Sequence, residues 1–265
     1  LLRHIFEGQN LQSICKGSSS SKPVTLQFWI KSSVTGTYAV ELYDEDNSRQ
    51  VSQSYTVNAA NTWEKKILTF PADISGAFNN DNNDSLYIQW GLSMGTNFTS
   101  GTLNTTWGGV TSFNRFSGQV NAFSSTSNNI YITGVQLEVG DTATPFEHRS
   151  FAEEISLCHR YFRVIGPYGN PRASGGNDFF LLNVMHNNEN RLCAPYFETP
   201  FRAVPSVTLI NHANGGTGAL TEFSSGSTRS QTSFSQIGLS GGGYPQFSSN
   251  FGNPAQYRAE YNAEL

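Results

Sequence analysis

Charged side chains are scarce in this sequence. Asp, Glu, Lys and Arg make up 14% of the 265 residues, against roughly 25% in a typical soluble domain. No lysine follows Lys66. The surface must therefore be built largely from Ser, Thr, Asn, Gln and Gly. The net charge is −4 and no block of basic residues occurs, so nucleic acid is not an expected partner.

Long apolar runs are also absent. No stretch approaches the ~18 residues that a membrane-spanning helix needs, so we expect no insertion into a membrane. The first residues, Leu1 to His4, lead into a mixed strand and not into an apolar signal segment.

Cysteine is scarce as well. Cys15, Cys158 and Cys193 lie far apart and are odd in number. This spacing excludes a disulfide framework and a paired-cysteine metal site. We therefore expect three free thiols, buried as small apolar side chains.

Short segments in which apolar and polar residues alternate are plentiful in the first half. In Ser85 to Met94, for example, Trp90 shares one face with the aliphatic residues, so we expect it in the core. Pro23 to Lys31, Trp63 to Phe70 and Ile130 to Val139 alternate as well. About eight such segments in ~140 residues indicate a sandwich of two sheets.

One segment has helical periodicity. Ser150 and Glu153 form a capping-box pattern, and apolar residues then recur at helical spacing from Phe151 to Ile165 before Gly166-Pro167. The remainder alternates again. The predicted strands are Asp178 to Met185, Arg191 to Phe197, Val207 to Ile210, Gly218 to Phe223, Thr232 to Leu239 and Gln256 to Leu265.

Four segments resemble a known family. They are Glu7 to Leu11, Lys22 to Ser32, Ala60 to Lys66, and Tyr131 to Gly140 with Ala143 to Glu147 behind it; Glu153 to Phe162 resembles the family's next signature. The sequence is similar to the carbohydrate-binding-module-like domain of tail-fibre and other virion proteins of phages, marine ones above all. The resemblance implies a jelly-roll, a place on the virion and a role in glycan binding, but it supplies no sugar-contacting residues.

The predicted fold is therefore all-β. A jelly-roll β-sandwich is expected at residues 1–149 and a short connecting helix at 150–166. A small β-sandwich domain, which looks like the domain that often follows in such proteins, is expected at 167–265.

The sequence does not favour catalysis. Gly238 to Gly242 fits the GxSxG pattern, but a nucleophile elbow needs a helix behind it, and Tyr244-Pro245 follows here. Nothing in the sequence brings two acids together as a glycosidase requires. We expect a protein that is not an enzyme and holds no cofactor apart from a candidate structural calcium ion.

That candidate ion would take oxygen ligands. Asp44 and Asp46 lie in an acidic turn, and jelly-rolls of this kind often hold calcium, to which Glu7 and Glu138 could contribute. The alternative is a set of solvated polar turns.

Tryptophans are the candidate glycan platforms. Trp29 and Trp63 lie on faces that differ from the core set, and Trp107 lies in a long polar stretch. The alternative for all three is packing on a second face or between subunits.

We expect a homo-oligomer, and a trimer because fibre proteins of this family are threefold. Soluble β-proteins protect strand edges with charge, especially lysine, and the later strands here have little. The helix would lie at the threefold axis or pack on its own domain.

The predicted function is that of a virion structural and adhesion protein, a tail fibre or another fibre component, at the particle surface. Its expected partners are copies of itself, other virion proteins and host-surface glycan. Two alternatives stay open: a carbohydrate-binding module of a secreted bacterial polysaccharide-active protein, and a tailspike-type depolymerase.

Overall fold

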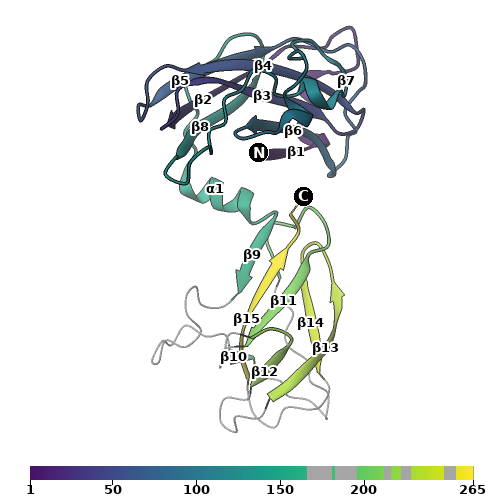
Figure 1. The fold of residues 1–265 in the computed structure, drawn as a ribbon. Helices are drawn as coiled ribbons and strands as arrows, with labels where there is room; N and C mark the ends of the chain where they lie inside the picture. Colours follow the sequence, from purple (N-terminus) through teal and green to yellow (C-terminus); the bar gives the residue numbers. More distant parts are fainter. Residues whose placement is uncertain (166–180, 183–195, 212–215, 222–227, 248–254, 265) are drawn as a thin grey trace. The chain divides into compact units, whose positions relative to one another are not determined.

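The computed structural model describes residues 1–165, 181–182, 196–211, 216–221, 228–247 and 255–264. The chain is divided into two compact units, Leu1–His148 and Arg149–Glu264. This division lies one residue from the boundary predicted after residue 149. The described part is made of antiparallel β-sheets and one short α-helix (Figure 1), which confirms the all-β class.

The first unit is a β-sandwich of the jelly-roll type. Its larger sheet has the order β1-β6-β3-β4-β7 and its smaller sheet the order β5-β2-β8 (Figure 1). The strands are β1 (Leu2–Glu7), β2 (Val24–Ser32), β3 (Gly36–Asp44), β4 (Arg49–Val57), β5 (Glu64–Phe70), β6 (Asp84–Gly91), β7 (Gly108–Gly109) and β8 (Ile130–Val139). Short 3-10 turns lie at Gly8–Asn10 (η1), Gln12–Ile14 (η2), Thr96–Phe98 (η3) and Ser112–Asn114 (η4).

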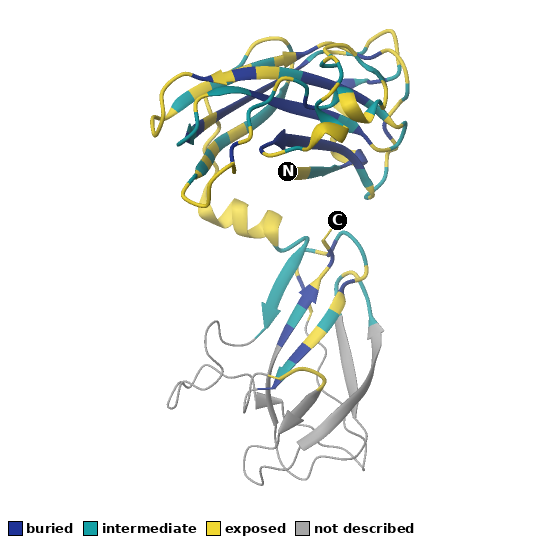
Figure 2. Cartoon of the chain, viewed as in Figure 1, coloured by how far each residue is buried: buried dark blue, intermediate teal, exposed yellow. Residues whose placement is uncertain are grey.

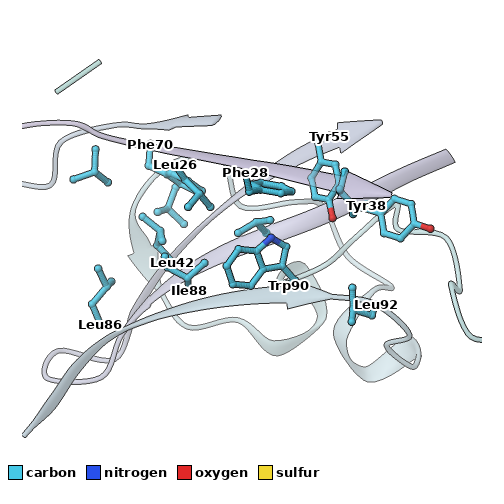
Figure 3. Close-up of a cluster of buried hydrophobic side chains, with 14 of the residues drawn as sticks. Leu26, Phe28, Tyr38, Leu42, Tyr55, Phe70, Leu86, Ile88, Trp90 and Leu92 are labelled. Atoms are coloured by element: carbon cyan, nitrogen blue, oxygen red, sulfur yellow. The ribbon is translucent and has the colours of Figure 1, made fainter. Parts of the chain in front are cut away.

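The core lies between the two sheets (Figure 3). Alternate residues of β6 point into it, and Trp90 is 2% exposed, as its pattern predicts. The ring of Phe28 on the facing sheet meets Trp90 and Tyr55 edge-on, with centroid distances of 5.8 and 5.2 Å. Strands from both sheets thus share one apolar cluster.

The long segment between β6 and β8 lies on the outer face of the five-stranded sheet. Arg115 in this segment donates to both carboxylate oxygens of Glu41 on β3, at 2.9 and 3.0 Å from Nε. Its guanidinium lies 5.2 Å from the ring centroid of Tyr43 and 5.7 Å from that of Phe116. Both Glu41 and Phe116 are fully buried, so the segment closes this face.

A buried lysine joins several loops of the same unit. The Lys16 ammonium lies 2.5 Å from Asp44 Oδ2 and 3.0 Å from Asp73 Oδ2. It also donates to the carbonyl oxygens of Ser75 and Gly76, at 3.0 and 2.7 Å. The Lys16 side chain is 2% exposed, so four oxygen atoms replace the water that it loses.

Further contacts surround this ammonium. Arg49 donates to both oxygens of Asp73, at 2.8 and 2.9 Å, so two cations balance two carboxylates. The rings of Phe78 and Trp107 lie 5.2 and 5.0 Å from Lys16 Nζ.

The second unit contains the helix and the later strands. Its elements are α1 (Phe151–Cys158), β9 (Phe162–Ile165), β10 (Leu181–Leu182), β11 (Ser206–Asn211), β12 (Ala219–Thr221), β13 (Thr228–Ile237), β14 (Gly242–Phe247) and β15 (Ala255–Asn262). Strands β9, β10 and β11 all pair with β15, and β12-β13-β14 forms a separate sheet. The rings of Phe197, Phe201 and Tyr261 pack together, with centroids 5.1 to 6.2 Å apart.

The helix is shorter than predicted. Its capping box is confirmed, since Ser150 Oγ accepts from the Glu153 backbone N–H and Glu153 accepts from that of Ser150. It ends at Cys158, however, and Phe162–Ile165 forms β9 instead. Pairing of β9 with β15 gives this segment partners along its whole length, which outweighs its helical spacing.

The strands predicted for the second half agree with the structure in part. Strands β11, β12, β13 and β15 overlap the predicted ones. Most of Asp178 to Met185 and of Arg191 to Phe197 lies outside the described residues. Strand β14 was not predicted, because Gly242-Gly243 and Pro245 indicate a loop.

The expected burial of the cysteines is wrong for two of the three residues. Both are free thiols, but Cys15 is only half-buried and Cys158 is exposed on α1. Cys193 lies outside the described residues.

We expect Lys16→Met to destabilise the protein by about 3–5 kcal/mol, because the substitution leaves the buried Asp44 carboxylate without its cation. Chemical denaturation followed by tryptophan fluorescence measures this difference. Lys22→Met is the control, since Lys22 is exposed and should change stability by less than about 0.5 kcal/mol. Equal effects of the two substitutions would contradict a special role for Lys16.

Candidate functional site

The outer face of the three-stranded sheet carries exposed aromatic residues in a regular arrangement. Side chains alternate along β2, so Trp29 and Lys31 point away from the core. The strand register places Trp29 between Lys65 on β5 and Thr133 on β8, and it places Lys31 opposite Tyr131. Trp63 directly precedes β5 and its ring lies 6.4 Å from that of Tyr131.

We define the aromatic face by the exposed apolar residues here. They are Trp29 (42% exposed), Trp63 (43%), Ile67 (52%), Tyr131 (52%) and Phe146 (40%). Exposed apolar residues that gather in one patch are typical of binding surfaces for a ligand or a partner. The sheet therefore buries its inner face in the core, and its outer face is exposed at these residues.

The position of Trp29 depends on a glycine. The pairing of β2 with β8 contains a β-bulge between Gln27 and Trp29, and Gly134 has a φ of +59°. A Cβ at Gly134 would lie 3.2 Å from Cδ1 of Trp29. Glycine thus tolerates the left-handed backbone and lets the indole ring lie close to β8.

One end of this outer face is covered by the chain itself. The segment Gly140 to Glu147 folds back over the sheet after β8. Gln27 Nε2 donates to the carbonyl oxygen of Thr144 at 2.7 Å, and the backbone N–H of Glu147 donates to Gln136 Oε1 at 2.8 Å. The face consequently has a closed end, and an open end at Trp29, Trp63 and Tyr131.

The four carboxylates proposed for calcium are not brought together. Asp44 pairs with Lys16, and Asp46 accepts from Asn79 N at 3.0 Å and Nδ2 at 2.7 Å. Glu7 is buried and accepts from Gln9 Nε2 at 2.5 Å. Within the described ranges no three His, Cys, Asp or Glu side chains are grouped so that they could hold a metal ion.

Glu138 belongs to the fold-back segment. It accepts from the backbone N–H of Thr144 at 3.1 Å and from its hydroxyl group. These hydrogen bonds hold the pKa of the Glu138 carboxyl below its ordinary value. Glu138 thus helps to hold the segment Gly140 to Glu147 over the closed end.

Trp107 lies apart from the other two candidate tryptophans. Its indole N–H donates to the carbonyl oxygen of Pro71 at 2.8 Å. Its ring is partly buried, packs against the core and lies beside Lys16 Nζ. These contacts fit a packing role and leave Trp29 and Trp63 as the exposed candidates.

The segment that fits the GxSxG pattern connects two strands. Ser240 lies in the turn between β13 and β14, where its carbonyl oxygen accepts from Phe197 N at 2.9 Å. A strand, not a helix, follows this turn, so the arrangement of a nucleophile elbow is missing. Glu153 caps α1.

Other residues of the site were not predicted from the sequence. Tyr131 and Lys31 were predictable from alternation opposite to the core residues. Phe146 was not, because the fold-back of the segment that carries it depends on side-chain hydrogen bonds to other strands.

Calcium should leave the stability of the protein unchanged, because the Lys16 ammonium already neutralises Asp44. An occupied site at 100 times its dissociation constant would add ~2.7 kcal/mol to the free energy of unfolding. Denaturation with 5 mM EDTA, and again with millimolar calcium, measures this. A stabilisation specific to calcium and lost in Asp46→Asn would show that the carboxylates do bind the ion.

No family model and no curated protein matches the chain. Within the described residues, no helix is long and apolar enough to cross a membrane. Among solved structures, the chain shows a similarity to the PBSX exported protein XepA, with 8% sequence identity and a TM-score of 0.17. The alignment covers 91% of this chain and 76% of that chain. This TM-score is too low to indicate a common fold.

Proposed function

We propose that the chain is a non-enzymatic adhesion and structural protein of a bacteriophage virion, lies at the particle surface, and binds host-surface glycans through the aromatic face. The observation that carries the glycan role is the exposure of Trp29, Trp63 and Tyr131 on one sheet face. The place on the virion rests on the resemblance of Glu7 to Phe162 to the phage family.

The chemistry of the open end suits a sugar. A sugar ring has apolar C–H faces that stack on Trp and Tyr, while its hydroxyl groups need polar partners around the ring. Thr133 lies opposite Trp29 and is exposed. Binding through one such shallow face is weak, and several copies on one particle would raise the overall avidity.

Catalysis is not part of the proposal. Glycosidases use two carboxyl groups that flank the scissile bond. Glu41 is held by Arg115 and Asp44 by Lys16, and both are fully buried. Neither carboxylate can reach a polysaccharide without breaking its ion pair.

The proposal includes a homotrimer that joins other virion proteins. Helix α1 has no buried residue and exposes Phe151 at 82% and Leu157 at 48% (Figure 2). Association of copies would remove this apolar surface from water.

We expect Trp29→Ala with Trp63→Ala to weaken glycan binding by about tenfold or more, because the stacking surface is lost. A glycan array and adsorption of the full-length protein to host cells measure the loss. The same incubation should release no oligosaccharide.

Phe123→Ala is the matched control, since Phe123 is an exposed aromatic residue outside the aromatic face. If the double variant adsorbs as well as the wild type, the face is not the binding site. If the wild type binds no glycan and no host cell, the adhesion role fails. Absence of the protein from purified phage particles, by mass spectrometry, would favour a secreted module instead.

The second expectation concerns assembly. The full-length protein should sediment as a trimer at micromolar concentration, and Phe151→Ser with Leu157→Ser should shift it towards the monomer because apolar contacts are lost. Ala152→Ser changes an exposed position of the same helix and should leave the sedimentation unchanged. A wild-type monomer would refute the trimer.

A further inference from the structure

The aromatic face carries two lysines that lie outside the ion pairs of the described residues. The chain has five lysines, at positions 16, 22, 31, 65 and 66. Lys16 pairs with Asp44, and Lys66 lies 2.6 Å from Glu64. Lys31 and Lys65 form no ion pair with any of the residues that the structure describes. Both point to the outer face of the three-stranded sheet.

The two lysines flank Trp29. Lys65 is its direct cross-strand neighbour on β5, and such neighbours have Cβ atoms ~4.5–5.5 Å apart. Lys31 is two residues further along β2, about 7 Å away, and its ammonium lies 5.2 Å from the ring centroid of Tyr131. A sugar ring stacked on Trp29 would therefore have an ammonium group on two sides.

Among the described residues, the acidic groups nearby form no ion pair with Lys31 or Lys65. Glu64 is neutralised by Lys66. The hydrogen bond from Lys66 and those from the backbone N–H groups of Ala59 and Asn58 lower the pKa of the Glu64 carboxyl to about 2. Glu138 lies opposite Thr25, which is four residues before Trp29 on β2. It is held by the fold-back segment at the closed end of the face. The positive charge of Lys65 helps to lower the pKa of the Glu138 carboxyl, but the two side chains form no ion pair. Glu147 is exposed at the closed end, where its N–H binds Gln136.

We propose that the aromatic face selects an anionic glycan, in which a sugar ring stacks on Trp29 while its acidic substituent pairs with Lys31 and Lys65. This proposal rests on the glycan role proposed above and names the class of ligand. A carboxylate, sulfate or phosphate group would supply the same negative charge. A neutral glycan would offer these two ammonium groups no anionic partner, in a protein whose net charge is −4.

The test compares charged and neutral probes on the full-length protein. Polygalacturonate carries carboxylates, heparin carries sulfates as well, teichoic acid carries phosphates and dextran is neutral. We expect at least one anionic polymer to bind more tightly than dextran. Lys31→Gln with Lys65→Gln should lower its affinity about tenfold at 50 mM NaCl, and less at 500 mM, because salt screens exposed ion pairs.

Lys22→Gln is the matched control. It removes the same charge from an exposed lysine that precedes β2, about 30 Å along the strand from Lys31, and it should leave affinity unchanged. Unchanged thermal unfolding verifies that the variants fold. The anion preferred by the wild type identifies which acidic group the lysines bind.

The outcomes separate the two proposals. If dextran or another neutral glycan binds as tightly as the anionic polymers and the lysine variant binds equally well, the anionic preference is wrong and the glycan role stands. An equal loss in Lys22→Gln would show non-specific charge attraction and would also overturn the preference. If no anionic polymer binds the wild type but the glycan array or host cells do, only the anionic preference fails; if nothing binds in any of these assays, both proposals fail.

Discussion

The buried ammonium group of Lys16 is the constraint on which the first unit depends. Removing such an ion from water costs several kcal/mol unless oxygen atoms replace the water. Here the replacements come from the end of β3 and from the segment that follows β5. Loops that are distant in sequence must therefore adopt one arrangement together, and Arg49 fixes Asp73 within it.

This network also determines which surface remains free. Trp107, which packs beside Lys16, anchors the long segment between β6 and β8 at one point, and Arg115 anchors it on Glu41 at another. The segment then occupies the outer face of the five-stranded sheet. The three-stranded sheet has only the short fold-back over one end of its outer face. The difference between the two faces leaves Trp29, Trp63 and Tyr131 exposed on the smaller sheet.

Sequence patterns predicted the parts of the fold that depend on local alternation. Strands β2 and β6 and the burial of Trp90 follow directly from it. Long-range pairing was not predictable in the same way: 28 residues separate Lys16 from Asp44, and the β-bulge at Gly134 appears only when β8 meets β2. Helix α1 illustrates the same limit, since a partner strand decided the structure of Phe162–Ile165.

The composition of the aromatic face favours a ligand over a protein partner. Aromatic residues are enriched in both kinds of surface, but lysine is depleted where proteins pack against each other. A partner that covered Trp29 would also have to remove the ammonium groups of Lys31 and Lys65 from water or pair them. Helix α1 exposes apolar residues and contains no lysine, which suits packing between copies. Two surfaces with different chemistry thus suit the two proposed tasks, glycan recognition and assembly.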